Sequence, residues 1–247
     1  MKIKIHDSTY IFLLLFFLAG YFECIYLLLI VILIHELGHC FFASLCGVKV
    51  LNILIYPFGG ISILQTDINL KIYKEFLCLI GGILFQIIFF IIVRYLYLNS
   101  YVSIHVFSLF KRINYFLISF NFLPIIPLDG GKLLNLIFDL LFNFKLSFKI
   151  TCFISILFSF IFLIYKFSFL SFVIFIFFIK SILFEVVNFK YKFNKFLLER
   201  LYKELHFKRY RFINNVNLFK RDCYHIINNE FESSFLKKYF NSYNTGV

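Results

Sequence analysis

Long apolar runs alternate with short polar segments along nearly the whole chain. Several runs approach the twenty or so residues that a helix needs to cross a bilayer. Little more than Glu23 separates the first run from the second, so these two are expected to form a tight helical hairpin, and only Lys166 separates the fifth from the sixth. Four or five spans remain an alternative count. We expect six membrane spans, at Thr9–Phe22, Cys24–Cys46, Phe76–Val93, Ile113–Phe138, Ile150–Tyr165 and Phe167–Val187.

The composition agrees with this pattern. Of 247 residues, 62% are hydrophobic and only 15% are charged, and the mean hydropathy is +0.89. A soluble domain of this length could not cover so much apolar surface with so little charge. The predicted fold class is therefore an all-α polytopic membrane protein with about six transmembrane helices. Its six cysteines include no C-x-x-C pair and are expected to be reduced thiols.

Two segments depart from the apolar helical pattern. Val48–Leu64 has β-branched and apolar residues on both sides of a Pro-Phe-Gly-Gly turn, which predicts a small membrane-associated β-hairpin. This hairpin is either a structural re-entrant loop or an edge to which an extended substrate adds as a strand. Residues 188–247 form a short cytosolic tail after a membrane domain at residues 1–187. Apolar residues at helical spacing open the tail as an amphipathic helix: Phe193, Phe196, Leu197, Leu201 and Leu205.

The charges predict the orientation of the chain. The net charge is +12, and about half of the 25 lysines and arginines lie in the tail. Most of the others fall in the loops that an even number of spans would place on the same side as both termini. By the positive-inside rule, both termini are expected in the cytosol. We therefore interpret the basic residues as an orientation signal and expect no direct contact with nucleic acid.

The most unusual stretch is VILIHELGHC, Val31–Cys40, inside the second predicted span. His35 and His39 are four residues apart, so on a helix they project from one face, where two imidazoles can hold one metal ion. Glu36 lies beside them and can accept a proton from water. Ionisable groups at membrane depth need a compensating partner, and a divalent cation compensates all three. The alternative is ordinary hydrogen bonding between helices.

A catalytic zinc requires a third protein ligand and keeps a fourth position open for water. Asp139 and Glu185 lie near predicted span ends, where a carboxylate is readily solvated. Asp129 is the stronger candidate because it lies in NFLPIIPLDGGKLL, residues 121–134, where two prolines interrupt the helix and two glycines follow. Irregular backbone at membrane depth is tolerated only where it is buried in protein or lines a cavity.

These two motifs carry a family resemblance. HELGH in one span and N-x-x-P-x-x-P-L-D-G-G in a later one resemble the site-2 protease family of intramembrane zinc metalloproteases, peptidase family M50. The similarity is greatest to the branch of that family found in endospore-forming bacteria. Where the family often has Ala-Gly-Pro, this chain has Gly81, Gly82 and Ile83, which we expect to alter helix packing and not chemistry. Further matching segments are YPFGG at Tyr56–Gly60, FLLERLY at Phe196–Tyr202 and FKRDCYH at Phe219–His225.

The resemblance implies roles for five residues. His35, His39 and Asp129 would bind Zn²⁺, Glu36 would act as general base and then general acid, and Asn121 would help to stabilise the oxyanion. The chain would thus be a zinc metalloendopeptidase. The resemblance also implies a nucleotide-responsive CBS domain at the C-terminus, of which the short tail is expected to retain only a reduced remnant.

The resemblance also suggests partners and a location. Cleavage is expected near the cytosolic face of a bacterial cell membrane, in sporulation the mother-cell membrane around the forespore. The implied substrate is a membrane-associated protein such as an inactive sigma-factor precursor, and the implied regulators are membrane-protein inhibitors. Within the protease class, the alternative is a general enzyme that cuts anti-sigma factors or signal-peptide remnants.

Two other classes of protein could also carry these residues. An ion transporter would keep His, Glu and Asp inside its spans, but it would usually show inverted repeats, and only one segment here is interrupted. An inactive membrane scaffold would have no use for the carboxylate of Glu36.

Overall fold

The computed structural model describes the whole chain except residues 1, 6–8, 11–16, 57–58, 66, 166–167, 204, 206, 208 and 245–247. Residues 11–16 of the predicted span Thr9–Phe22 therefore lie outside the described residues. The chain divides into two compact units. Unit 1 consists of residues 1–66 and 73–122, and unit 2 consists of residues 67–72 and 123–247.

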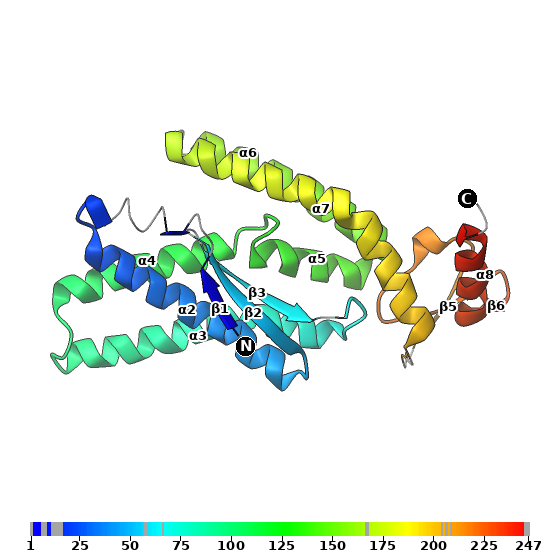
Figure 1. The fold of residues 1–247 in the computed structure, drawn as a ribbon, viewed down its shortest axis with the longest axis horizontal. Coiled ribbons are helices and arrows are strands. Elements are labelled where there is room, and N and C mark those ends of the chain that lie inside the picture. The colour runs from blue at the N-terminus through cyan, green and yellow to red at the C-terminus, as the bar shows by residue number, and fades with distance from the viewer. Residues whose placement is uncertain are drawn as a thin grey trace. The chain divides into compact units, whose positions relative to one another are not determined.

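Unit 1 combines three long helices with a three-stranded sheet (Figure 1). Helices α2 and α3 confirm the spans predicted at Cys24–Cys46 and Phe76–Val93. Apolar side chains of α2, α3 and α4 form the buried core of the bundle. The elements are β1 (Lys2–Ile5), α2 (Phe22–Leu45), β2 (Lys49–Tyr56), β3 (Gly59–Gln65), α3 (Ile72–Leu98) and α4 (Ile104–Asn121).

The end of α2 is set by a glycine. Gly47 has a φ of +77°, a left-handed conformation that costs a residue without Cβ little. The Gly47 N–H donates to the Ser44 carbonyl, and the Val48 N–H donates to the Ala43 carbonyl at 2.9 Å. These two hydrogen bonds form a Schellman motif, which satisfies the last carbonyls of the helix. It turns the chain directly into β2.

The predicted hairpin is present as the antiparallel pair β2–β3, with a register shift between Val50 and Asn52. The sequence pattern did not predict β1, which pairs in parallel with β2. The strand order is β1-β2-β3. Strand β2 is therefore paired along both edges, and β3 has one edge open within the described sheet.

Unit 2 contains three helices followed by a small α/β segment. Helices α6 and α7 lie side by side (Figure 1). In the second sheet, β4 and β5 are parallel, and β5 and β6 are antiparallel. The elements are α5 (Asp129–Leu141), α6 (Phe144–Tyr165), α7 (Phe169–Tyr202), β4 (Tyr210–Ile213), the 3₁₀ turn η1 (Val216–Leu218), β5 (Tyr224–Ile227), β6 (Glu230–Phe231) and α8 (Glu232–Asn244).

The span predicted at Ile113–Phe138 was wrong as a single helix. Helix α4 ends at Asn121, and α5 begins only at Asp129. The segment between them contains Pro124 and Pro127, which lack the N–H that a helix interior requires. With 13 residues, α5 is only about 20 Å long, too short to cross a hydrocarbon core of about 30 Å.

The last predicted span and the predicted amphipathic helix after it form one continuous helix. Helix α7 continues past Val187 to Tyr202 and is 34 residues long, because no proline or glycine interrupts residues 188–202. The predicted amphipathic helix is thus the end of α7. The assignment of residues 188–247 to a separate cytosolic domain stays a prediction.

Among the described residues, four helices are long and apolar enough to cross a membrane: α2, α3, α6 and α7. The all-α membrane class is therefore supported, but the predicted number of six spans is not confirmed.

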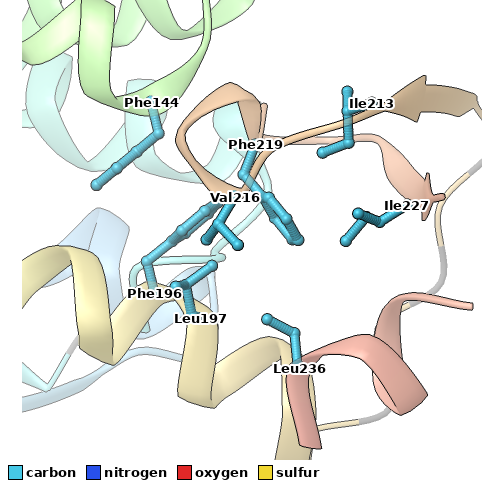
Figure 2. Packing of buried hydrophobic residues seen from close by; sticks show 8 residues of the cluster. All are labelled: Phe144, Phe196, Leu197, Ile213, Val216, Phe219, Ile227 and Leu236. Carbon is cyan, nitrogen blue, oxygen red and sulfur yellow. The ribbon is translucent and has the colours of Figure 1, made fainter. Parts of the chain in front are cut away.

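The end of α7 forms a hydrophobic core with the C-terminal segment (Figure 2). Phe196 and Leu197 of α7 are fully buried there, together with Leu236 of α8. The Phe144 ring stacks on that of Phe196, with ring centroids 4.5 Å apart. The remaining members of this core are Ile213, Val216, Phe219 and Ile227.

A buried polar network joins the same elements. Arg200 of α7 forms an ion pair with Glu232 of α8 at 2.9 Å, and both side chains are at most 3% exposed. The guanidinium also donates to the carbonyls of Cys223 and Lys220. A buried charge is tolerated when it is paired and hydrogen-bonded in this way. Arg200 therefore connects α7, the loop before β5, and α8.

His225 of β5 completes this network in its neutral form. Its Nε2 accepts the Lys220 N–H at 3.1 Å, which a protonated imidazole could not do. Burial lowers the pKa of His225, and the charge of Arg200 lowers it further against the opposing effect of Glu232. Burial raises the pKa of Glu232, but its bonds to His225 and the charge of Arg200 outweigh that effect and hold its pKa below the ordinary value.

These two shifts predict that acid destabilises the C-terminal segment. Below the ordinary histidine pKa of 6.5, the unfolded state binds a proton that the folded His225 resists, so stability falls as the pH falls. Glu232 adds a loss of the same sign below its ordinary pKa of 4.5. The thermal unfolding temperature in detergent should decrease from pH 7.5 to 5, and less steeply for His225→Gln. An equal pH dependence of the unfolding temperature in the wild type and His225→Gln would contradict this role of His225.

Arg200→Met should destabilise the C-terminal segment by about 3–5 kcal/mol, because it leaves the Glu232 carboxylate without its buried cation. Hydrogen exchange of the β5 and α8 amides would measure the effect. Arg209→Met is the matched control, because Arg209 is exposed, and this change should leave exchange unaltered. Equal exchange in the two variants would show that the ion pair contributes nothing.

Candidate metal centre

His35, Glu36 and His39 gather on one side of α2. Their ligand atoms all lie within 4.8 Å of one another, and the three residues are 4%, 3% and 7% exposed. The i, i+4 spacing predicted that the two imidazoles would face the same way. Their Nε2 atoms are 3.0 Å apart.

Each histidine is oriented through its other ring nitrogen by α3. Nδ1 of His39 donates to the Cys78 carbonyl at 2.8 Å, and since a carbonyl only accepts, that nitrogen carries the proton. Nδ1 of His35 lies 3.0 Å from Oε1 of Gln86, again an acceptor. In the neutral rings both Nε2 atoms are therefore unprotonated and present lone pairs.

This donor set fits a zinc ion. Two nitrogen lone pairs that face each other across 3.0 Å repel unless a cation lies against both. Tetrahedral zinc with Zn–N bonds of about 2.0–2.1 Å holds two imidazole nitrogens at a separation of roughly 3.3 Å, close to the one observed. Hydrogen bonding of the Nδ1 atoms to carbonyl-type acceptors is the usual outer support of such ligands.

Glycines bring α3 against the two histidines. A Cβ at Gly82 would lie 2.5 Å from Nε2 of His39 and 2.6 Å from Cε1 of His35. Gly38, which directly precedes His39 on α2, packs on the backbone of Gly81. Any larger side chain at these positions would push the helices apart and withdraw the acceptors from the imidazoles.

Asn121 lies at the last residue of α4. Its Nδ2 is 3.3 Å from Nε2 of His35, so this amide reaches the nitrogen that is predicted to bind the metal. The sequence-based expectation that Asn121 belongs to the site agrees with this position. Its catalytic role stays a prediction.

Asp129 belongs to unit 2, where it is the first residue of α5 and 7% exposed. Lys132 Nζ lies 3.0 Å from its Oδ1. The turn before α5 is tight, because a Cβ at Gly131 would lie 2.5 Å from the Ile125 backbone. The role of Asp129 as third ligand stays a prediction.

The two alternative carboxylates have evident structural partners. Asp139 forms a buried ion pair with Arg221 at 3.0 Å, and Glu185 pairs with Lys192. Sequence reasoning missed Gln86 and the Cys78 carbonyl. A glutamine in the middle of an apolar span is a signal that could have revealed Gln86, whereas a backbone carbonyl leaves no trace in the sequence.

Comparison with known proteins gives the family. The model of peptidase family M50 matches residues 23–103, which include both histidines and Gln86. Stage IV sporulation protein FB of Bacillus subtilis is 31% identical over 207 residues, which cover 82% of this chain and 72% of that protein. The chain belongs to peptidase family M50.

Other M50 relatives agree. A zinc metalloprotease of Methanocaldococcus jannaschii is 33% identical over 118 residues, 45% of this chain and 33% of that protein. The solved site-2 protease from the same organism has the same fold, with a TM-score of 0.57, 24% identity, and coverage of 73% of this chain and 88% of that one. This M50 chain is thus an integral membrane zinc metalloprotease.

Gly82→Ala should lower zinc affinity by about tenfold or more, the usual scale for a disturbed outer shell. The new Cβ would displace both imidazoles, although alanine by itself favours a helix over glycine. Zinc per chain after dialysis against a chelator measures the loss. Leu84→Ala on the outer face of α3 is the control and should retain zinc; equal retention in both would contradict the packing argument.

Proposed function

We propose that this protease hydrolyses a peptide bond of a membrane-associated protein near the cytosolic face of the membrane. His35, His39 and Asp129 hold the zinc, Glu36 transfers protons, and Asn121 stabilises the oxyanion. The observation that carries the proposal is the pair of buried imidazoles whose unprotonated Nε2 atoms face each other beside a buried carboxylate.

Zinc supplies a Lewis acid that activates water and polarises the scissile carbonyl. Glu36 accepts the proton of the attacking water and later delivers it to the leaving amine nitrogen. The amide of Asn121 donates to the oxygen on which negative charge develops. Burial of all three α2 groups excludes bulk water and so strengthens these interactions.

The substrate has to enter in extended form, because a helix shields its own peptide bonds. Strand β3 supports strand addition, since β2 is paired on both sides and β3 only on one. A substrate strand would add to that edge with backbone hydrogen bonds. The positive charges of the loops and tail support placing both termini, and the cleavage, on the cytosolic side.

The substrate we propose is a membrane-associated sigma-factor precursor, activated during sporulation in the mother-cell membrane. Support comes from the identity of 31% over most of the chain to a protein named for stage IV of sporulation. Membrane-protein inhibitors would hold the enzyme inactive until cleavage is required.

The test is cleavage of a tagged sigma-factor precursor co-expressed with the protease. The wild type should cleave it, whereas Glu36→Gln should retain zinc and cleave nothing, because the proton acceptor is lost. Glu23→Gln on the same helix is the control; Glu23 is exposed, and cleavage should persist. Cleavage by Glu36→Gln would overturn the assigned role, and failure of the zinc-loaded wild type would overturn the proposed substrate.

Asp129→Ala should lower zinc affinity by more than the tenfold to hundredfold that outer-shell partners contribute, because it removes a ligand. Lys132→Met is the matched control, since it removes only the half-exposed ion-pair partner of Asp129. Titration with a zinc chelator measures both. Unchanged affinity in Asp129→Ala would exclude this residue as a ligand.

A further inference from the structure

Gln86 is a fully buried amide in the middle of α3. Its Oε1 faces Nδ1 of His35 at 3.0 Å. Its Nε2 is buried and has no hydrogen-bond partner among the described residues. A buried amide N–H₂ without a partner is costly, so a second group is expected to accept from it.

Asn114 of α4 has the complementary unsatisfied group, an acceptor. It is 1% exposed, and in the described part of the chain its Oδ1 has no donor. One buried donor and one buried acceptor are thus left over in the same helical bundle.

The register of α3 and α4 places these two amides at the same level. The rings of Phe89 and Phe90 of α3 contact Phe110 of α4, with centroids 5.4 and 6.2 Å apart. Phe90 also contacts Phe107, and Tyr97 contacts Phe107 at 4.4 Å, so the helices are antiparallel. From the Phe89–Phe110 contact, one turn back along α3 leads to Gln86, and one turn forward along α4 leads to Asn114.

We propose that Asn114 and Gln86 form a buried amide chain that positions His35 for the metal. Nε2 of Gln86 donates through one bridging water molecule to Oδ1 of Asn114, and Oε1 of Gln86 accepts from Nδ1 of His35. The proposal rests on His35 being a zinc ligand, as in the proposed function. Both residues are positioning residues, since neither touches the reacting atoms.

The amide chain matters because the Gln86 side chain has two orientations, which exchange the positions of its oxygen and its nitrogen. If Gln86 were flipped, its N–H₂ would face Nδ1 of His35, and the imidazole would carry its proton on Nε2, the nitrogen required for the metal. An acceptor at Asn114 favours the orientation in which Gln86 presents oxygen to His35. The histidine is then held in the metal-binding tautomer before zinc arrives. His39 needs no such device, because the Cys78 carbonyl can only accept.

The test is zinc affinity in detergent, measured by competition with a chelator, together with the visible spectrum of the Co²⁺-substituted protein. Gln86→Met keeps the volume without the acceptor and should weaken zinc binding by about 10–100-fold. Asn114→Leu should weaken it severalfold. Because Gln86 and Asn114 act through the same amide chain, the double variant should bind zinc as weakly as Gln86→Met alone. Two independent sites would instead show additive effects.

Phe89→Leu is the packing control, because it alters the same helix contact without touching a hydrogen bond of the chain. It should lower the unfolding temperature while leaving zinc affinity and the Co²⁺ spectrum unchanged. Wild-type zinc affinity in Gln86→Met or Asn114→Leu, or effects that multiply in the double variant, would overturn the amide chain. A wild type that binds no zinc would instead overturn the metal site of the proposed function.

Discussion

The cost of burying ionisable side chains at membrane depth is the constraint on which the rest of the structure depends. His35, Glu36 and His39 lie within one turn of a helix long enough to cross a bilayer, and all are buried. Polar groups in such surroundings need partners. The Nδ1 atoms have carbonyl-type acceptors, which leaves two unprotonated nitrogens facing each other. A metal ion bound to both nitrogens would relieve that repulsion, and α3 holds the two imidazoles in position for it.

The contact between α2 and α3 requires residues without side chains. Gly38, Gly81 and Gly82 let α2 and α3 approach until backbone touches backbone. Only at that separation do Gln86 and the Cys78 carbonyl reach the two imidazoles. Phenylalanine rings elsewhere between α3 and α4 fill the wider spaces and set their register. The close packing of α2 against α3 therefore also orients the two proposed metal ligands.

The sequence predicted the parts of this design that follow from periodicity and from side-chain chemistry. The i, i+4 spacing of His35 and His39 was sufficient to predict one face, and the turn around residues 57–60 was sufficient to predict the β2–β3 pair. The span through Pro124 and Pro127 was wrong because hydropathy averages over an interruption that backbone hydrogen bonding does not tolerate. The last predicted span and the amphipathic helix after it are one helix, α7, because no proline or glycine separates them. Parallel pairing by β1 and the role of Gln86 depend on contacts between distant segments, which no local pattern reveals.

The central claim is that zinc is held inside the membrane by the two histidines of α2. X-ray absorption at the zinc edge of the purified, detergent-solubilised chain tests it most directly. The account predicts one zinc per chain in a shell of nitrogen and oxygen at about 2.0–2.2 Å, with the multiple scattering of two imidazoles. A shell of sulfur at about 2.3 Å, which the six cysteines could supply, or a shell without imidazole scattering would contradict it.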